Sequence, residues 1–151
     1  MVVLYGDHYG LTNSDNPYLA SLIGKSSADW TNFDNVQLQR VPFMIYMKGL
    51  KGRVSSTYGG EIDVLPTLLH LLGISNQHYV QFGTDLLSSQ HNSTVILRNH
   101  NFITPRYTVL GGKGAAGKVY DNKTGEQITL ISQQLKRQLN REQQYVNQAL
   151  S

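Results

Sequence analysis

The chain has 151 residues, of which 40% are apolar and 15% charged, and its formal net charge is +3 at pH 7. These values are typical of a soluble globular protein with a core of useful size. No apolar run is long enough to span a bilayer, and the apolar start lacks the basic region and cleavage site of a signal peptide. The absence of cysteine excludes disulfides and thiolate metal sites.

The mild basicity includes two short groups of cations, Lys48, Lys51 and Arg53, and Lys136, Arg137 and Arg141. Neither group has the density or the interleaved aromatic residues of a nucleic-acid site. We therefore expect no nucleic-acid partner and interpret both groups as solvated surface.

The chain opens with the pattern of a buried strand. Residues 2–5, Val-Val-Leu-Tyr, are β-branched, aliphatic or aromatic, and a turn between Gly6 and Gly10 ends them. Capping and stop residues then predict a short helix over 17–24. Residues 25–39 are polar, and we expect a loop there.

A second strand and the clearest helix follow. Residues 41–47 are apolar on both faces, which is typical of a parallel strand covered by helices. Residues 49–60 are rich in glycine, serine and lysine and predict a loop. Apolar residues then recur at helical spacing over 62–72, with Pro66 in the first turn and Gly73 as the stop.

The second half changes character. Turn residues separate four short strands, predicted over 94–97, 102–104, 107–110 and 119–120. A final helix from Ser132 aligns Leu135, Leu139, Val146 and Leu150 on one stripe. The predicted fold class is α/β: a partial parallel sheet with covering helices, then a small antiparallel β-meander and a C-terminal helix.

The chain begins directly with an apolar strand, which suggests a segment cut from a larger sheet. We expect residues 1–90 to form part of an α/β core and residues 91–151 to form an antiparallel subdomain with the final helix. A strand edge that has lost its cover can pair with another chain, so we also expect self-association through residues 2–5.

Asp7 and His8 are the candidate metal ligands. They follow the first strand, and ligands bind outside the carboxyl ends of strands in open α/β sheets. A carboxylate oxygen beside an imidazole nitrogen suits Mn²⁺ or Zn²⁺ better than Ca²⁺. Taken alone, the pair is also a common strand-to-loop junction in which the aspartate caps the next element.

Six segments in order resemble the lipoteichoic acid synthases, phosphoglycerol transferases with a sulfatase-like fold of the alkaline phosphatase superfamily. The resemblance covers essentially the whole chain. It is carried by residues 5–10 (YGDHYG), 41–45 (VPFMI), 58–69 (YGGEIDVLPTLL), 82–87 (FGTDLL), 98–99 (RN) with 102–104 (FIT), and 119–126 (VYDNKTGE).

The resemblance implies that Asp7 and His8 hold the metal and that this chain is the C-terminal part of such an enzyme. The nucleophilic threonine, an acidic metal ligand and the substrate-binding residues would all lie upstream, on the missing catalytic part. The whole enzyme would transfer glycerol phosphate from phosphatidylglycerol to a growing teichoic acid polymer. It would work on the extracellular face of a bacterial membrane, anchored by upstream helices, and this chain alone would be inactive.

Two other functions stay open at the level of sequence. One is a sulfatase- or phosphatase-type hydrolase of the same superfamily, although such enzymes often have Asp-His-Gly where this chain has Tyr9. The other is a binding module without catalysis. The remaining histidines, His70, His78, His91 and His100, are expected at the surface, Asp63 is expected to cap or brace its helix, Trp30 is expected to pack, and Arg98 is expected to form a strand-end salt bridge.

Overall fold

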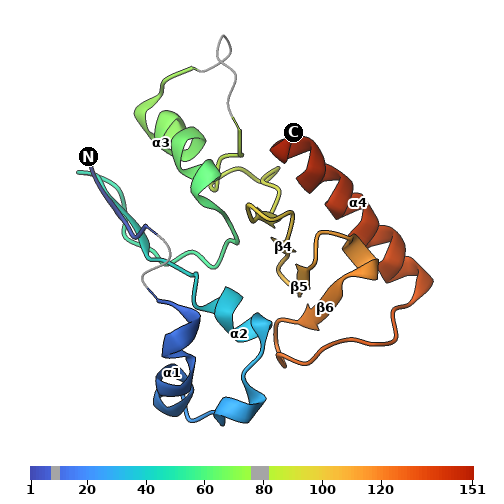
Figure 1. Ribbon diagram of the computed structural model, residues 1–151. Coiled ribbons are helices and arrows are strands. Elements are labelled where there is room, and N and C mark those ends of the chain that lie inside the picture. Colours follow the sequence, from blue (N-terminus) through green and yellow to red (C-terminus); the bar gives the residue numbers. More distant parts are fainter. Residues whose placement is uncertain (8–10, 76–81) are drawn as a thin grey trace. The chain divides into compact units, whose positions relative to one another are not determined.

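The computed structural model describes residues 1–7, 11–75 and 82–151, and the chain forms two compact units, Met1–Val54 and Ser55–Ser151 (Figure 1). The division predicted from the sequence, at residues 90 and 91, falls inside the second unit. As a statement about the domains of a longer protein it stays a prediction.

In the first unit, β1 (Val2–Tyr5) pairs with β2 (Phe43–Tyr46) in a two-stranded antiparallel sheet. The predicted parallel pairing is therefore wrong for this chain. Gly6 N–H donates to the Pro42 carbonyl at 3.1 Å and extends the ladder by one step. Parallel pairing is slightly less stable per residue than antiparallel pairing and occurs where helices cover both faces of a sheet. A two-stranded sheet lacks that cover.

One face of this sheet carries exposed apolar side chains, which we call the bare face. The register places Val2 opposite Tyr46 and Leu4 opposite Met44, and these four side chains are 53%, 70%, 57% and 55% exposed. The expectation that the first strand is buried is therefore wrong for this chain. An apolar strand is buried only if another layer covers it, and residues 1–7 and 11–54 supply no such layer over this face.

Between the strands, the 3₁₀ turns η1 (Asn13–Asp15) and η2 (Ser27–Asp29) precede the helices α1 (Asn16–Leu22) and α2 (Asn32–Gln37), respectively. The predicted helix at 17–24 is confirmed as α1, whereas α2 lies in the segment predicted to be a loop. The sequence signal for α2 is a capping box. Asp34, at the third helical position, accepts hydrogen bonds from the backbone N–H and hydroxyl of Thr31 at 2.7 and 3.0 Å.

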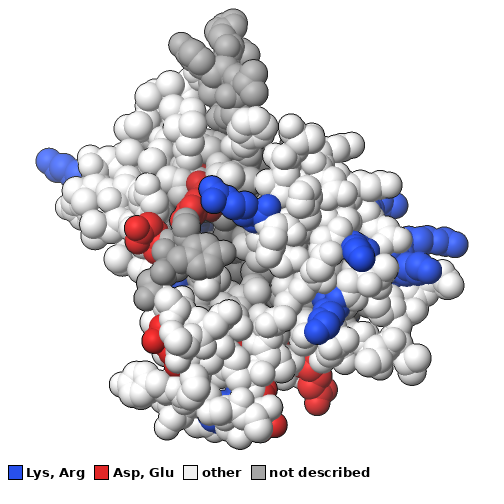
Figure 2. Space-filling model, viewed as in Figure 1, with Lys and Arg blue, Asp and Glu red and all other residues white. Residues whose placement is uncertain are grey.

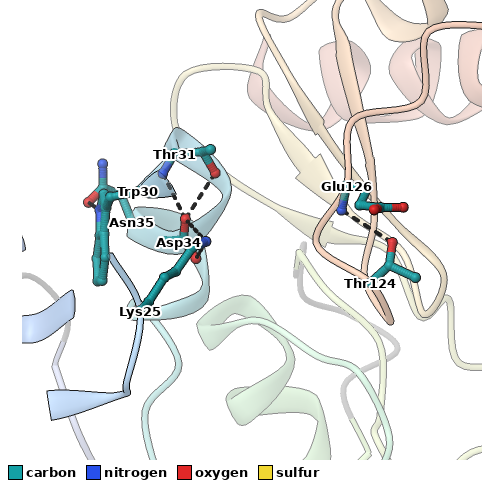
Figure 3. A network of polar contacts seen from close by, with 7 residues as sticks. All are labelled: Lys25, Trp30, Thr31, Asp34, Asn35, Thr124 and Glu126. Atoms are coloured by element: carbon teal, nitrogen blue, oxygen red, sulfur yellow. Dashed lines mark hydrogen bonds and ion pairs between the residues drawn. The ribbon is translucent and has the colours of Figure 1, made fainter. Parts of the chain in front are cut away.

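A lysine completes this cap (Figure 3). Lys25 Nζ lies 2.7 Å from Asp34 Oδ1, and the Trp30 indole N–H donates to Asn35 Oδ1 at 2.9 Å. Burial by itself would raise the pKa of Asp34, but the hydrogen bonds from Lys25 and Thr31 outweigh it and hold that pKa below its ordinary value. The cap thus ties α2 to the segment that enters it.

The second unit begins with a loop and then the 3₁₀ turn η3 (Glu61–Asp63), which continues into α3 (Val64–Leu72). The helix ends at Gly73, which has φ +67° and is in the left-handed conformation that glycine adopts without strain. The predicted helix and its stop are both confirmed.

The four predicted strands are confirmed as an antiparallel sheet in the order β3 (Val95–Ile96), β4 (Phe102–Ile103), β5 (Tyr107–Leu110) and β6 (Lys118–Asp121). Helix α4 (Gln133–Leu150) lies beside this sheet (Figure 1). Their shared core consists of Phe102, Tyr107, Val109, Val119, Leu139 and Val146, all at most 7% exposed. Of the apolar stripe predicted for the last helix, Leu139 and Val146 lie in this core and Leu135 packs against it, whereas Leu150 is exposed.

The chain is thus a mixed helix-and-sheet structure with an antiparallel meander and a C-terminal helix, as the predicted fold class requires apart from the strand pairing. Among the described residues, no helix combines the length and the apolar character needed to cross a membrane.

Candidate functional site

The first of the two predicted metal ligands lies at the carboxyl end of β1. Asp7 follows Gly6, the last residue bonded to the neighbouring strand, and its side chain is exposed. The carboxylate is therefore accessible to an ion. His8 lies outside the described residues, so the expectation that both side chains converge on one point stays a prediction.

A metal ion needs more donors than this pair provides, since zinc sites use three or four protein ligands. Among the described residues, no group of three or more histidine, aspartate and glutamate side chains is placed to hold an ion. The oxygen and nitrogen donors fit a transition metal by type, but further ligands would have to come from elsewhere. The resemblance places an acidic ligand outside the chain, and this stays a prediction.

A buried polar centre lies in the second unit, around the carboxylate of Asp63, which is 3% exposed. Asp63 Oδ2 accepts the backbone N–H of Gly60 at 2.8 Å, and Oδ1 accepts that of Thr84 at 2.7 Å. The carboxylate thus links the loop before α3 to a segment about twenty residues later. We call this arrangement the Asp63 brace. It confirms the role predicted for Asp63.

A second contact reinforces the brace one helical turn further along. Thr67 donates its hydroxyl proton to the Asp63 carbonyl at 2.6 Å and accepts the Leu86 N–H at 3.0 Å. Gly83, with φ +82°, fits against η3, where an added Cβ would collide with the Ile62 carbonyl oxygen. The 83–86 segment therefore packs tightly on the start of α3.

His91 is held by both ring nitrogens, and its expected surface role is wrong. Nε2 lies 2.7 Å from the Tyr58 carbonyl oxygen, and Nδ1 lies 2.6 Å from Thr84 Oγ1. Because a carbonyl only accepts, Nε2 carries a proton, and in the neutral ring Nδ1 accepts the Thr84 hydroxyl. No local pattern predicts these contacts, because Tyr58 lies 33 residues away along the chain.

This centre has the chemistry of a structural support. Each of its hydroxyl, carboxylate and imidazole groups is engaged by a partner within the chain. A catalytic nucleophile would instead need a hydroxyl beside a free base. The centre therefore fixes the 58–60 and 83–91 segments on α3, and the reaction chemistry predicted for this protein is not located there.

The other residues considered from the sequence have mostly simple roles. His70 is exposed as predicted and pairs with Asp85 at 2.6 Å, and His100 is exposed and lies 2.9 Å from Asn147 Oδ1. Trp30 is partly buried and hydrogen-bonded. Arg98 makes no ion pair with a residue in the described ranges, so its predicted salt bridge is not found there. His78 lies outside the described residues.

Comparison with known proteins finds similar chains among the lipoteichoic acid synthases. Lipoteichoic acid synthase 1 of Bacillus subtilis (strain 168) is 48% identical over 128 residues, which are 85% of this chain. Lipoteichoic acid synthase of Staphylococcus saprophyticus is 41% identical over 129 residues, and the lipoteichoic acid synthase-like protein YvgJ of B. subtilis is 43% identical over 129 residues. No protein-family model matches the chain.

The chain spans only about a fifth of these relatives, 19–20% of their length. A match of this extent fits a C-terminal portion, as the order of motifs predicts. Over 85% of its length, this chain is homologous to a segment of the lipoteichoic acid synthases.

Proposed function

We propose that this chain is the C-terminal portion of a phosphoglycerol transferase that moves glycerol phosphate from phosphatidylglycerol to a growing teichoic acid chain. The observation that carries the proposal is the 40–48% identity to several lipoteichoic acid synthases over 85% of the chain. Identity at this level, extending over both compact units, indicates common chemistry in the protein to which the chain contributes.

The proposed reaction has two displacements at phosphorus. A threonine hydroxyl outside this chain attacks the phosphorus of phosphatidylglycerol, loses its proton and releases diacylglycerol with a protonated oxygen. The glycerol phosphate is then esterified to the threonine. A terminal hydroxyl of the polymer attacks the same phosphorus, the threonine oxygen is released and regains a proton, and the polymer grows by one unit.

Asp7 and His8 would supply two ligands to a Mn²⁺ or Zn²⁺ ion in that site. When bound, such an ion would stabilise negative charge on the attacking oxygen and on the phosphoryl group. The support from this chain is the exposure of Asp7 at the end of β1 and the donor types of the pair. The other ligands and the nucleophile would come from the remainder of the enzyme, so this chain alone would be inactive.

The remainder of the enzyme would also cover the bare face of the β1–β2 sheet, where four large apolar side chains are at least 53% exposed. We further propose that the whole protein is anchored by upstream helices at the extracellular face of a bacterial membrane, where phosphatidylglycerol and the polymer meet. In isolation, the chain would instead associate with itself through the bare face.

The test compares variants of the longer protein that contains this chain, with fluorescent phosphatidylglycerol as donor and diacylglycerol release as readout. Asp7→Ala and His8→Ala should each abolish release and lower the bound metal, measured by mass spectrometry. Asp29→Ala, which removes an exposed carboxylate from η2, is the matched control and should leave both unchanged.

Two results would overturn the proposal. One is full activity after Asp7→Ala. The other is turnover by the isolated chain that Asp7→Ala abolishes, since the chain would then carry a complete site. A hydrolase of the same superfamily would release glycerol phosphate to water at the same rate with and without polymer acceptor, whereas a transferase requires the acceptor for elongation.

A further inference from the structure

The positive charge of the chain is concentrated in its last third. Residues 98–151 contain eight lysines and arginines and three carboxylates, whereas residues 1–97 contain five lysines and arginines and seven carboxylates. The modest net charge of +3 therefore conceals a basic segment joined to a slightly acidic one. Such asymmetry is a physical signal for an anionic partner.

Helix α4 presents the densest part of this charge to solvent. Lys136, Arg137 and Arg141 are all exposed, and none forms an ion pair with a residue in the described ranges. The single carboxylate on the helix, Glu142, accepts the Thr94 hydroxyl at 2.8 Å. The rest of the exposed face is formed almost entirely by side-chain amides, those of Gln133, Gln134, Gln138, Asn140, Gln144, Asn147 and Gln148.

The stability of the helix does not account for these cations. The helix begins at Gln133, so Lys136 lies in its first turn and Arg137 directly after it. Cations there face the positive end of the helix dipole, and Arg137 and Arg141 are like charges at the unfavourable spacing of four residues. Each placement costs a little stability, which suggests that the positions serve binding.

The 3₁₀ turn η4 (Gly114–Ala116) brings two further cations to this helix. Gly114 N–H donates to Gln143 Oε1 at 2.7 Å, and Ala115 N–H donates to Asn140 Oδ1 at 3.0 Å. The turn is flanked by Lys113 and Lys118, both exposed. Figure 2 shows basic side chains gathered over the region where Figure 1 places α4 and the β5–β6 hairpin.

We propose that this basic surface, formed by Lys113, Lys118, Lys136, Arg137 and Arg141, binds a linear phosphodiester polymer, the anionic acceptor of the proposed transfer reaction. The inference rests on that proposed function and gives its polymer a second contact away from the metal ligands. Each repeat of such a polymer carries one negative charge, which suits cations spread along a helix. The interleaved amides can hydrogen-bond to its phosphate oxygens and polyol hydroxyls.

The surface fits a hydrated polymer better than a membrane or a nucleic acid. A helix that lies on a bilayer turns large apolar residues toward the lipid, but the apolar stripe of α4 is used in the core, with Leu139 and Val146 fully buried. A single-stranded nucleic acid requires aromatic side chains on which bases stack, and the exposed face of α4 has cations and amides instead.

The test is a binding assay with the full 151-residue chain and a fluorescent, deacylated poly(glycerol phosphate) chain. The triple variant K136Q/R137Q/R141Q should weaken binding roughly tenfold or more, and the slope of log affinity against log salt should fall by roughly two to three. Its melting temperature should be unchanged or raised, because the cations near the helix start are gone. A structural role for these residues would lower it.

The matched control is K48Q/K51Q/R53Q, which removes the same net charge from exposed positions in the first unit. It should change the affinity less than twofold.

Equal losses of affinity in both variants would show that net charge alone drives binding, and no loss in the α4 triple variant would show that α4 is not the contact. Phosphatidylglycerol vesicles that bind as tightly and compete with the polymer would show that the surface recognises membrane. Any of these three results overturns the proposal. Because no turnover is measured, failure of the transfer assay would leave the binding result intact.

Discussion

The Asp63 brace provides the sharpest test of how the second unit is held together. Replacing Asp63 with alanine removes a carboxylate that is 3% exposed and accepts two backbone N–H groups, those of Gly60 and Thr84, at 2.8 and 2.7 Å. Both donors would be left without their acceptor at a partly buried position. The change should therefore destabilise the unit without touching its apolar core.

The magnitude follows from the two bonds. A hydrogen bond to a charged group contributes about 1.5–3 kcal/mol, so losing both costs roughly 3–6 kcal/mol before relaxation. Water that enters beside the shortened side chain would satisfy part of this loss. We therefore expect the free energy of unfolding to fall by about 3 kcal/mol. Asp63→Asn keeps one acceptor oxygen and should lose roughly half as much.

The assay is urea denaturation followed by far-ultraviolet circular dichroism, with hydrogen exchange at the amides of Gly60 and Thr84. Glu61→Ala is the matched control, since Glu61 lies two residues earlier in η3, is exposed, and makes no side-chain hydrogen bond with the described residues. The control should lose less than about 0.5 kcal/mol. The reasoning is refuted if the two alanine variants lose the same stability or if both amides keep their protection after Asp63→Ala.

Three further changes test other parts of the structure. Gly83→Ala places a methyl group against the carbonyl of Ile62 in η3, at φ +82°, and should lower the free energy of unfolding by about 2 kcal/mol or more. Gly73→Ala, at φ +67° with no atom within 4 Å of the added carbon, should lower it by only about 1 kcal/mol. Urea titration of both variants measures the difference. The pKa of Asp34 is lowered in the folded state, so its contribution to the free energy of unfolding is complete well above the ordinary value of 3.8 and is lost as the pH falls through and below that value. Asp34→Asn should therefore flatten the acid side of the plot of stability against pH, followed by tryptophan fluorescence. An unchanged plot would contradict this. Leu4→Lys should shift the isolated chain toward monomer in analytical ultracentrifugation. The control Leu130→Lys, at a leucine outside the bare face that is 91% exposed, should not. A wild-type chain that is already monomeric at high concentration rules out the association.

Local sequence was sufficient for the elements whose signals lie within one turn or one hairpin. The helix α3 follows from apolar spacing and from a glycine stop, and the meander follows from short apolar runs between turn residues. The helix α4 follows from its apolar stripe, of which Leu139 and Val146 join the core with Phe102 and Val109. Helix α2 was missed although its capping box, Thr31 and Asp34, was present, because the segment around it is polar.

The homology also follows from sequence, because six motifs in fixed order identify a family even when the folded contacts are unknown. The candidate site was predictable only as far as Asp7 and His8 follow an apolar strand. Strand direction was not predictable, since the same apolar run suits a parallel or an antiparallel neighbour and the choice depends on which layers cover it.

The remaining features depend on contacts between distant parts of the chain. The partners of His91 and Asp63 are backbone groups 33 and 21 residues away, and backbone groups have no sequence signature. The joining of η4 to α4, and with it the basic surface, rests on Gln143 and Asn140 accepting N–H groups more than twenty residues upstream. The sequence by itself determined α1, α3 and α4, the meander strands and the family. Tertiary structure decided strand pairing, the brace and the grouping of charges, because those depend on which distant groups are brought within hydrogen-bond or Coulomb range.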